Sequence, residues 1–324
     1  MYKSNEILEM VNHALAHLPY DRQPKELYEP VRYVLSLGGK RIRPVLMLMG
    51  YNLYRDDVER IMSPALGLET YHNYTLLHDD LMDRADVRRG QPTVHRRWNE
   101  NQAILSGDSM LVLAYQRMAR CDAKMLPRVM ELFTETALEI GEGQQYDIDF
   151  ETRNDVREDE YIEMIRLKTS VLLACALKIG AMLAGAPDTD ANILYQFGER
   201  IGLAFQLQDD YLDVYGDFET FGKRIGGDIL CNKKTYMLIN AQLLANEEQR
   251  AELERWLDAT EYGEEEKIKA VTRIYDDIGI PQLARRKIEY YYDLAAESLS
   301  HVDLPEERKQ LLWQYAQQML NRQS

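Results

Sequence analysis

The chain has 324 residues, of which 45% are hydrophobic and 29% charged, so it can bury a sizeable core and is not intrinsically disordered. It carries 39 Lys and Arg against 54 Asp and Glu, and the net charge of −15 argues against a nucleic-acid-binding protein. Its 18 Gly and 10 Pro are few for this length, which favours long helices over short strands.

Apolar residues recur at helical spacing along most of the chain. The segment Glu26 to Leu37 has apolar residues three and four apart, and Gly38 and Gly39 end it. The same pattern predicts helices over residues 44–55, 60–82, 99–120, 126–149, 159–185, 190–215, 233–246, 248–258, 263–275, 280–299 and 305–322. Turn residues separate these segments without a long linker. We therefore expect an all-α fold, a single domain over residues 1–324 built as a bundle of about 10–13 helices.

Cysteine usage and apolar segments bear on the cellular compartment. Cys121, Cys175 and Cys231 are odd in number and far apart, which is typical of free thiols in a reducing compartment. The first residues lack the apolar stretch of a secretory signal. The most apolar segment, residues 171–186, contains Lys178 and is shorter than the ~20 residues that span a bilayer. We expect a cytoplasmic protein with no transmembrane segment.

The chain contains the motif Asp-Asp-x-x-Asp twice, each time at the end of an apolar helical segment. The acidic residues are Asp79, Asp80 and Asp83 in the first motif and Asp209, Asp210 and Asp213 in the second. The first and last aspartates of each motif lie on one helix face, where their charges repel. Mg²⁺ reverses that cost, because it binds carboxylates while keeping water and phosphate oxygens as ligands. A chance acidic helix end is the alternative, but two independent copies would arise in roughly one chain in a thousand.

Basic residues flank both motifs. They are Arg88 and Arg89 after the first motif, Lys223 and Lys233 after the second, and Lys40, Arg41 and Arg43 at a predicted helix start. Any single one could be a solvated surface residue. In a chain of net charge −15, however, a polyanionic substrate needs local cations. Two metal-binding clusters with these cations indicate facing helices that hold an anionic group.

Several stretches together resemble the trans-isoprenyl diphosphate synthases, the family that includes farnesyl and geranylgeranyl diphosphate synthases. They are Gly39 to Pro44, His78 to Asp83 with Arg88 to Gly90, Gly143 to Asp147, Lys168 with Thr169, Phe205 to Asp213, Gly222 with Lys223, Gly227 with Asp228, and Asn232 with Lys233. They follow the family's order from about residue 38 to 236. The resemblance implies an all-α fold around a central cavity, a homodimer, and Mg²⁺ as the cofactor, about three ions with substrate bound.

The resemblance also implies roles for individual residues. It makes Asp79, Asp83 and Asp209 the principal Mg²⁺ ligands, with Asp80, Asp210 and Asp213 in support. The positions for isopentenyl diphosphate are Lys40, Arg43, His72 and Arg89, and those for the allylic diphosphate are Arg88, Lys168, Thr169, Gln206, Lys223 and Lys233. Gln144 and Asp147 match a polar pair facing the reaction cavity.

The family's reaction suits these residue types. The C–O bond of an allylic diphosphate ionises, the double bond of isopentenyl diphosphate attacks the allylic cation, and the released diphosphate takes the final proton. Cations must stabilise the departing diphosphate, and no protein nucleophile is needed. The catalytic set implied is Asp79, Asp80, Asp83, Arg88, Lys168, Asp209, Asp210 and Lys223.

The residues before the first motif bear on product length. Tyr74 lies about 7–8 Å along a helix from Asp79, with Tyr71 a turn further, and both could form a floor for the growing chain. Thr75 is not aromatic and the motif has no two-residue insertion, a combination similar to archaeal-type geranylgeranyl synthases. We expect a C15 or C20 product, leaning to C20, from dimethylallyl, geranyl or farnesyl diphosphate. Core packing of Tyr74 is the alternative.

Three rival functions remain open. A long-chain polyprenyl diphosphate synthase would carry the same metal motifs and differ at Tyr74. A class I terpene cyclase would have a different second motif and would lack the isopentenyl positions Lys40, Arg43 and His72. A regulatory subunit without catalysis generally loses one aspartate motif, and both are complete in this chain.

Overall fold

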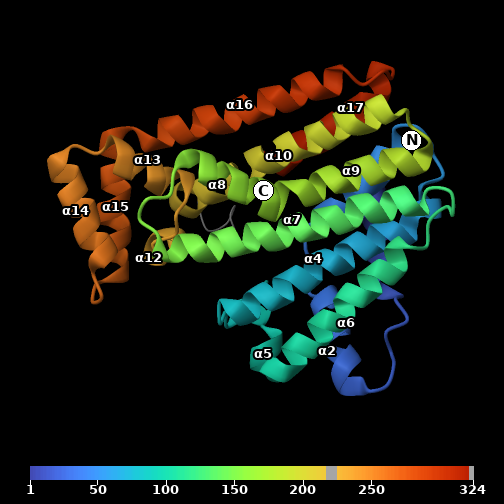
Figure 1. The fold of residues 1–324 in the computed structure, drawn as a ribbon, viewed down its shortest axis with the longest axis horizontal. Coiled ribbons are helices and arrows are strands. Elements are labelled where there is room, and N and C mark those ends of the chain that lie inside the picture. The colour runs from blue at the N-terminus through green and yellow to red at the C-terminus, as the bar shows by residue number, and fades with distance from the viewer. Residues whose placement is uncertain (217–224, 321–324) are drawn as a thin grey trace. The chain divides into compact units, whose positions relative to one another are not determined.

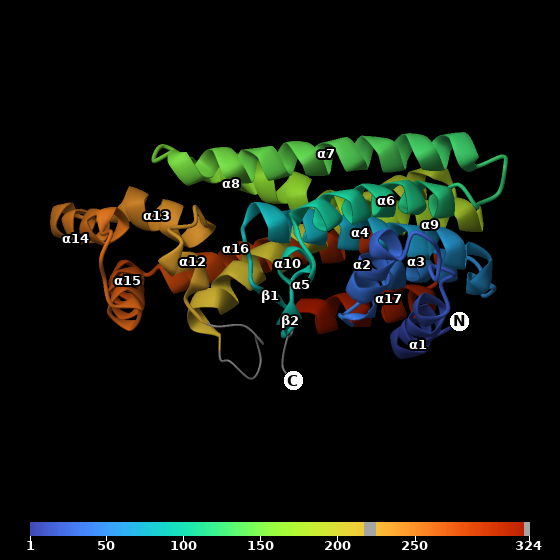
Figure 2. The ribbon, with the colours of Figure 1, turned by 90° about the horizontal axis from the view of Figure 1, so that it is seen from below.

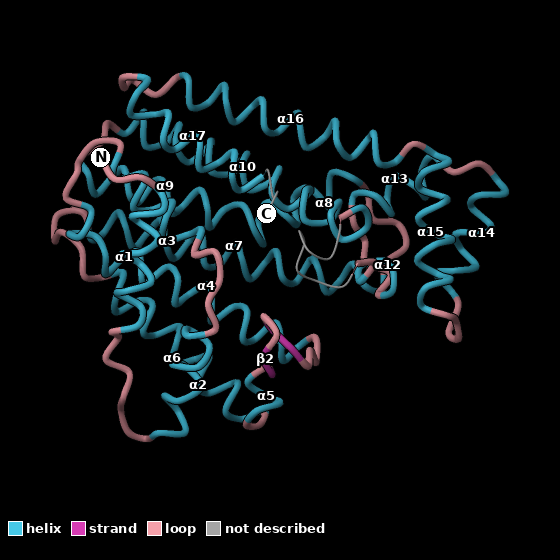
Figure 3. Tube along the Cα trace, turned by 180° about the vertical axis from the view of Figure 1, so that it is seen from behind, coloured by secondary structure: helices cyan, strands magenta, loops and turns pink. Residues whose placement is uncertain are grey.

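A computed structural model of the chain describes residues 1–216 and 225–320, and it confirms the all-α fold. In the described residues, regular structure other than helix is confined to a short antiparallel hairpin of β1 (Val87–Arg88) and β2 (Gln91–Pro92) (Figure 3). The helices are α1 (Ser4–Ala16), α2 (Lys25–Ser36), α3 (Ile42–Asn52), η1 (Val58–Ile61), α4 (Met62–Met82), α5 (Val94–Arg97), α6 (Glu100–Met118), α7 (Leu126–Thr152), α8 (Glu158–Ile165), η2 (Arg166–Ser170), α9 (Val171–Ala184), α10 (Asp188–Tyr215), α12 (Gly227–Leu230), α13 (Tyr236–Leu244), α14 (Glu247–Asp258), α15 (Glu264–Ile278), α16 (Ile280–Ser300) and α17 (Glu306–Leu320).

The predicted helices match the observed ones within a few residues. The structure adds the short helices α5 and α12, and α1, whose narrow apolar stripe consists of Ile7, Val11 and Leu15. It also adds a π-helical turn, η2, inside the segment predicted as one helix over residues 159–185. A π-turn depends on what packs against it, so helical periodicity could not reveal it.

The chain folds as two compact units. Unit 1 comprises Met1–Thr134, Cys175–Leu194 and Asp303–Leu312. Unit 2 comprises Glu135–Ala174, Tyr195–Val302 and the segment from Trp313 onward. The single domain expected from the sequence stays a prediction. Each unit contains one of the two aspartate motifs.

Helix α4 forms the centre of unit 1. Its N-terminal half, from Pro64 to Tyr71, is buried on all sides, and α3 packs against the helix. Helix α6 lies beside α4 along its length (Figure 1). The approach of α6 is close: a Cβ on Gly67 would lie 3.0 Å from the carbonyl oxygen of Ala114. The polar C-terminal end of α4 is thereby held in place beside α6.

In unit 2, glycines allow η2 to pack tightly against its neighbours. A Cβ on Gly143 of α7 would lie 2.4 Å from the backbone nitrogen of Lys168, and one on Gly202 of α10 would lie 2.6 Å from the α-carbon of Ser170. Further along the unit, the short helix α12 lies beside α15 (Figure 2). These contacts place η2 and the α12 turn next to the second aspartate motif.

One helical run among the described residues is long and apolar enough to cross a membrane. It extends from Glu158 to Ala184, and 78% of its most apolar window is buried inside the protein. That burial is typical of a core helix. The run is longer than the apolar segment 171–186 of the sequence, because α8 and η2 continue directly into α9.

Candidate active site

The first aspartate motif forms the last turn of α4. Asp79 is half-buried and Asp83, the C-cap residue, is exposed. Asp80 is buried, and its Oδ2 accepts a hydrogen bond of 2.7 Å from Arg88 Nε. Asp80 Oδ1 is buried without a partner among the described residues. Asp80 therefore holds Arg88 beside the motif, while Asp79 and Asp83 are the more accessible carboxylates.

The second motif, at the end of α10 in unit 2, also has a half-buried first and a buried second aspartate, but its third, Asp213, is buried, unlike Asp83. Asp209 is half-buried, whereas Asp210 is buried and accepts hydrogen bonds from Tyr161 Oη and from Gln206 Nε2, the latter at 2.9 Å. Asp213 Oδ2 accepts from the backbone N–H of Asp228 at 2.9 Å. Burial and, secondarily, the negative charge of Asp228 raise the pKa of Asp210. In both motifs the second aspartate is thus bound to other protein groups.

The π-turn η2 presents two of the predicted substrate residues. Lys168 Nζ donates to Asp147 Oδ2 at 2.6 Å, and Thr169 Oγ1 donates to Gln206 Oε1 at 3.0 Å. Because Gln206 also donates to Asp210, Thr169 and Gln206 form one hydrogen-bonded network with the second motif. Gln144 is half-buried on the same helix as Asp147. Lys223 lies outside the described residues.

Lys233 lies in the same carboxylate-rich region. Burial lowers its pKa, but the negative charges of nearby aspartates outweigh burial and keep the pKa above its usual value. The acidic residues responsible are Asp228, Asp147, Asp210 and Asp209. Lys233 is therefore a fixed positive charge next to the second motif at any physiological pH.

In unit 1, the basic residues around the start of α3 differ in where their side chains lie. Arg41 has a left-handed φ of 48° and points into the core, where its guanidinium pairs with Glu69 at 2.7 Å. Arg43 Nη1 donates to His72 Nε2 at 3.1 Å, and Lys40 is exposed. Arg41 is thus a structural residue, and Lys40 and Arg43 stay predicted site residues.

Arg89 reaches back from the hairpin to the same loop. Its Nη1 donates to the carbonyl oxygen of Gly38. A Cβ on Gly39, whose φ is +125°, would lie 2.8 Å from the Arg89 guanidinium carbon. The charges of Arg43 and Arg89 also act on His72. Three of the four residues predicted for isopentenyl diphosphate therefore lie together, around the loop that carries Lys40.

Gly39→Ala is expected to displace Arg89 and to raise the KM for isopentenyl diphosphate about tenfold, because one charge-assisted hydrogen bond is worth ~1.5–3 kcal/mol. Gly185→Ala is the control, since Gly185 also has a positive φ, +85°, but has no atom near its Cβ position. Steady-state kinetics of both variants test this. An equal rise of the KM in both variants would mean that backbone strain alone explains the effect. An unchanged KM in Gly39→Ala would contradict the role of Arg89.

His72 is neutral in the folded protein. Burial, followed by the positive charges of Arg43 and Arg89, lowers its pKa well below 6.5. A neutral Nε2 is free to accept the Arg43 hydrogen bond. At neutral pH the site therefore obtains its positive charge from arginine and lysine.

Because unfolded His72 takes up a proton below about pH 6.5 and folded His72 does not, this residue destabilises the fold as the pH falls through that value. Between pH 6 and 5 we expect the free energy of unfolding to fall more steeply in the wild type than in His72→Gln, by up to ~1.4 kcal/mol per pH unit. Urea unfolding at pH 7, 6 and 5 measures this difference. Parallel curves would mean that His72 titrates normally in the fold.

Aromatic side chains pack against one another, tilted or edge to face, between α4 and its neighbours in unit 1. The Tyr74 ring lies 4.9 Å from His78 and 5.6 Å from Tyr71, and Tyr71 lies 5.3 Å from Phe133. Phe133 in turn lies 5.0 Å from Tyr115. Tyr74 is half-buried, and Thr75 bonds to the backbone of its own helix. The predicted floor residues are therefore backed by a rigid second layer.

The carboxylates fit a cation that is shared with a substrate. Among the described residues, no three His, Cys, Asp or Glu side chains are placed to hold a metal ion by themselves. Mg²⁺ does not need such a cage, since it keeps waters and substrate phosphate oxygens as ligands. The first motif supplies oxygen ligands of the required kind: Oδ1 of Asp80, which has no hydrogen-bond partner, and the more accessible carboxylates of Asp79 and Asp83.

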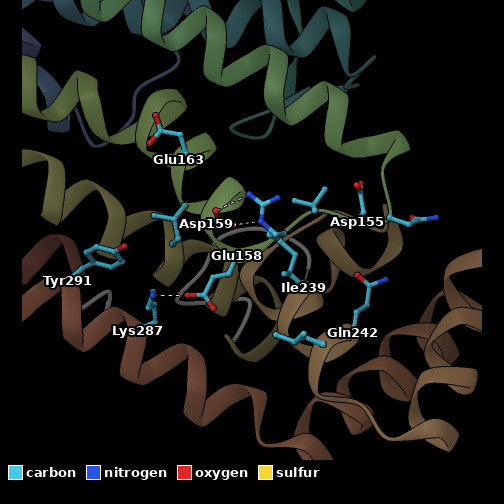
Figure 4. Close-up of a pocket in the computed structure, with 13 residues that line it drawn as sticks. Asp155, Glu158, Asp159, Glu163, Ile239, Gln242, Lys287 and Tyr291 are labelled. Atoms are coloured by element: carbon cyan, nitrogen blue, oxygen red, sulfur yellow. Dashed lines mark hydrogen bonds and ion pairs between the residues drawn. The ribbon is translucent and has the colours of Figure 1, made fainter.

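Unit 2 also contains a groove of about 790 Å³ at the start of α8. Its carboxylates already have protein partners: Glu158 binds Lys287 at 2.8 Å and Asp159 binds Arg157 at 2.9 Å (Figure 4). Asp155 and Glu163 are likewise paired with arginines. No residue predicted for the site lines this groove, so it is not the candidate active site.

Comparison with known proteins identifies the family. The model of the polyprenyl synthetase family matches residues 24–275. The chain belongs to this family. Its members are prenyltransferases, and the chain is therefore one. It is 38% identical over 311 residues to a geranylgeranyl diphosphate synthase from Methanosarcina mazei, covering 94% of this chain and 92% of that protein.

Solved structures of family members share the whole fold. A crystal structure of a geranylgeranyl pyrophosphate synthase superposes with a TM-score of 0.93 at 40% identity and covers 100% of both chains. A second, from Corynebacterium glutamicum, was crystallised with isoprenyl diphosphate and magnesium; it has a TM-score of 0.85 at 27% identity, covering 99% of this chain and 98% of that one. These neighbours support the predicted family and the use of a divalent metal.

Sequence reasoning assigned no role to several residues that the structure places at the candidate sites. Tyr161 and Asp228 contact the second motif, and Phe133 and Tyr115 support the aromatic cluster. All are distant in sequence from the residues they contact. Asp228 had a signal, because it follows a glycine in one of the stretches that resemble the family, but the other three had none.

Proposed function

We propose that this prenyltransferase condenses isopentenyl diphosphate with allylic diphosphates to give a short-chain trans-prenyl diphosphate, with C20 as the main product. The observation that carries the proposal is the paired organisation of the aspartate motifs, each with a protein-bound second aspartate and nearby cations. Family membership and the similarity to geranylgeranyl diphosphate synthases support it.

We assign Mg²⁺ binding to the carboxylates of both motifs, with Asp79, Asp83 and Asp209 as principal ligands and Asp80, Asp210 and Asp213 in support. Bound Mg²⁺ would supply positive charge to the leaving diphosphate. Arg88, which Asp80 holds, and Lys168, which Asp147 holds, add fixed positive charge for the same group. Thr169, Gln206, Lys223 and Lys233 complete the allylic set.

Isopentenyl diphosphate binds Lys40, Arg43, His72 and Arg89 in this proposal. The allylic C–O bond breaks with its electron pair on the diphosphate, and the isopentenyl double bond forms the new C–C bond to the resulting cation. A proton then leaves the adjacent carbon and goes to the released diphosphate. The arginine cluster orients the acceptor and keeps its own diphosphate in place, while the neutral His72 accepts from Arg43.

The test is product analysis with purified protein, Mg²⁺, isopentenyl diphosphate and each of dimethylallyl, geranyl and farnesyl diphosphate. We expect diphosphate release and a C20 product by mass spectrometry, and no turnover after chelation of the metal. Products of C30 or longer would favour a long-chain synthase. The absence of turnover with every primer would favour a regulatory subunit.

We further propose a cytoplasmic homodimer. Ile104, Leu105 and Val112 are 45%, 56% and 60% exposed, and their spacing along α6 puts them on one face of that helix as an apolar patch. Covering by a second copy would remove them from water. Light scattering should give twice the mass of one chain, and Val112→Glu should shift the particle toward the monomer.

A further inference from the structure

A buried lysine in unit 2 has no role in the reaction proposed above. Lys267 on α15 is 1% exposed, and its Nζ donates to Asn232 Oδ1 at 2.7 Å and lies 4.3 Å from the centre of the Tyr262 ring. Among the described residues, no carboxylate lies within ion-pair distance of it. Burying an ammonium group without a carboxylate costs free energy that a methionine of similar volume would not cost. Apolar packing of α15 alone therefore does not explain a lysine at this position.

The partner of Lys267 is held in an unusual conformation. Asn232 has a left-handed φ of 54°. Its amide is fixed at both ends, since Oδ1 accepts from Lys267 and Nδ2 donates to the carbonyl oxygen of Leu257 at 2.9 Å. Lys267 thus anchors a turn that the backbone alone would not favour.

Other groups beside Lys267 bind the same turn. Tyr262 Oη donates to the carbonyl oxygen of Leu230 at 3.2 Å, and a Cβ on Gly226 would lie 2.6 Å from the Ile268 side chain. Figure 2 shows α12, which starts the turn, beside α15. The turn from residue 226 to 232 is therefore held at three points, by Lys267 and Ile268 of α15 and by Tyr262, which precedes α15.

This turn leads directly into the site. Lys233 follows Asn232, and its backbone N–H donates to the carbonyl oxygen of Asp228 at 2.9 Å, while the N–H of Asp228 donates to Asp213. The cavity beneath Asn232 and Lys233 measures about 10 Å³, close to the minimum for a single water. A shift of Asn232 would therefore move Lys233 rather than be absorbed by empty space.

We propose that Lys267 is a positioning residue for the allylic diphosphate, acting through Asn232 to fix the turn that presents Lys233. The inference rests on the function proposed above, in which Lys233 binds that diphosphate.

Lys267→Met tests it by separating positioning from stability. The variant is expected to keep or raise the melting temperature, because it removes a buried charge. Its KM for the allylic diphosphate should nevertheless rise about tenfold, while the KM for isopentenyl diphosphate stays unchanged. Lys269→Met is the matched control, since the Lys269 side chain is 80% exposed and pairs with Glu265 at 3.8 Å. Wild-type KM values in Lys267→Met, or equal increases in both KM values, would overturn the proposal.

Two further variants test the route through Asn232. Lys267→Arg should restore most of the allylic affinity, because it keeps a donor within reach of Asn232. Asn232→Gly can adopt the left-handed backbone conformation but removes the side chain that Lys267 binds. It should therefore reproduce the Lys267→Met effect. In the double variant Lys267→Met with Asn232→Gly, the loss should equal that of either single variant. If the losses of allylic affinity in the two single variants multiply in the double variant, Lys267 acts by another route.

Calorimetry with inorganic diphosphate and Mg²⁺ makes the two proposals separable. If the wild type forms no product with any primer, the proposed function fails. The positioning role then stands if Lys267→Met weakens diphosphate binding about tenfold relative to Lys269→Met, and it fails if the two variants bind alike.

Discussion

Asp79→Asn is expected to lower kcat by about three orders of magnitude, corresponding to ~4 kcal/mol of lost transition-state stabilisation. The substitution keeps the shape of the side chain but removes the negative charge that a metal ligand at the end of α4 must supply. Asp79 is the half-buried aspartate of its motif, whereas Asp80 is occupied by Arg88. The rate of the Asp79→Asn variant, measured over a range of Mg²⁺ concentrations, should also depend less on Mg²⁺ than the wild-type rate does.

Asp86→Asn is the matched control for that substitution. Asp86 follows the same motif, but its side chain is 76% exposed and pairs with Arg96 at 2.7 Å. It should leave kcat within about twofold of the wild type, as surface ion pairs contribute little. If Asp79→Asn kept a rate within tenfold of the control, the first motif would not be the metal site.

Tyr74→Ala is expected to shift the main product from C20 to C25 and longer. Removing the ring opens space five residues before the motif, and the rings behind it, Tyr71 and Phe133, cannot collapse into that space because they are already packed. Mass spectrometry of the products from farnesyl diphosphate measures this shift. The ratio of C20 to longer products should fall about tenfold relative to the wild type.

Tyr290→Ala controls for the loss of a tyrosine ring, because Tyr290 is 54% exposed on α16. It should leave the product distribution unchanged. An unchanged C20 product from Tyr74→Ala, with normal turnover, would mean that Tyr74 belongs to the core and that another residue limits the chain.

The aspartate motifs could be predicted because their information is local. Two carboxylates four residues apart lie on one helix face whatever surrounds the helix, and α4 and α10 place them so. The helices themselves were predictable for the same reason, since apolar periodicity is a property of a short segment. The resemblance to the family rested on these local stretches, and the comparisons confirmed it.

The roles within each motif were not predictable in this way. Nothing near Asp210 in the sequence shows that Tyr161, 49 residues away, binds it. Nothing near Arg41 shows that it turns inward to Glu69. The buried link from Lys267 to Asn232 spans 35 residues and has no motif.

The sequence by itself determined the helical class, the positions of both carboxylate motifs and the family to which they point. Only the tertiary structure decided which carboxylates are bound by other protein groups, which basic residue enters the core, and which side chains support the tyrosine floor. The physical reason is that helix periodicity and charge spacing arise between neighbours along the chain. Burial and hydrogen-bond partners arise between residues that only folding brings together.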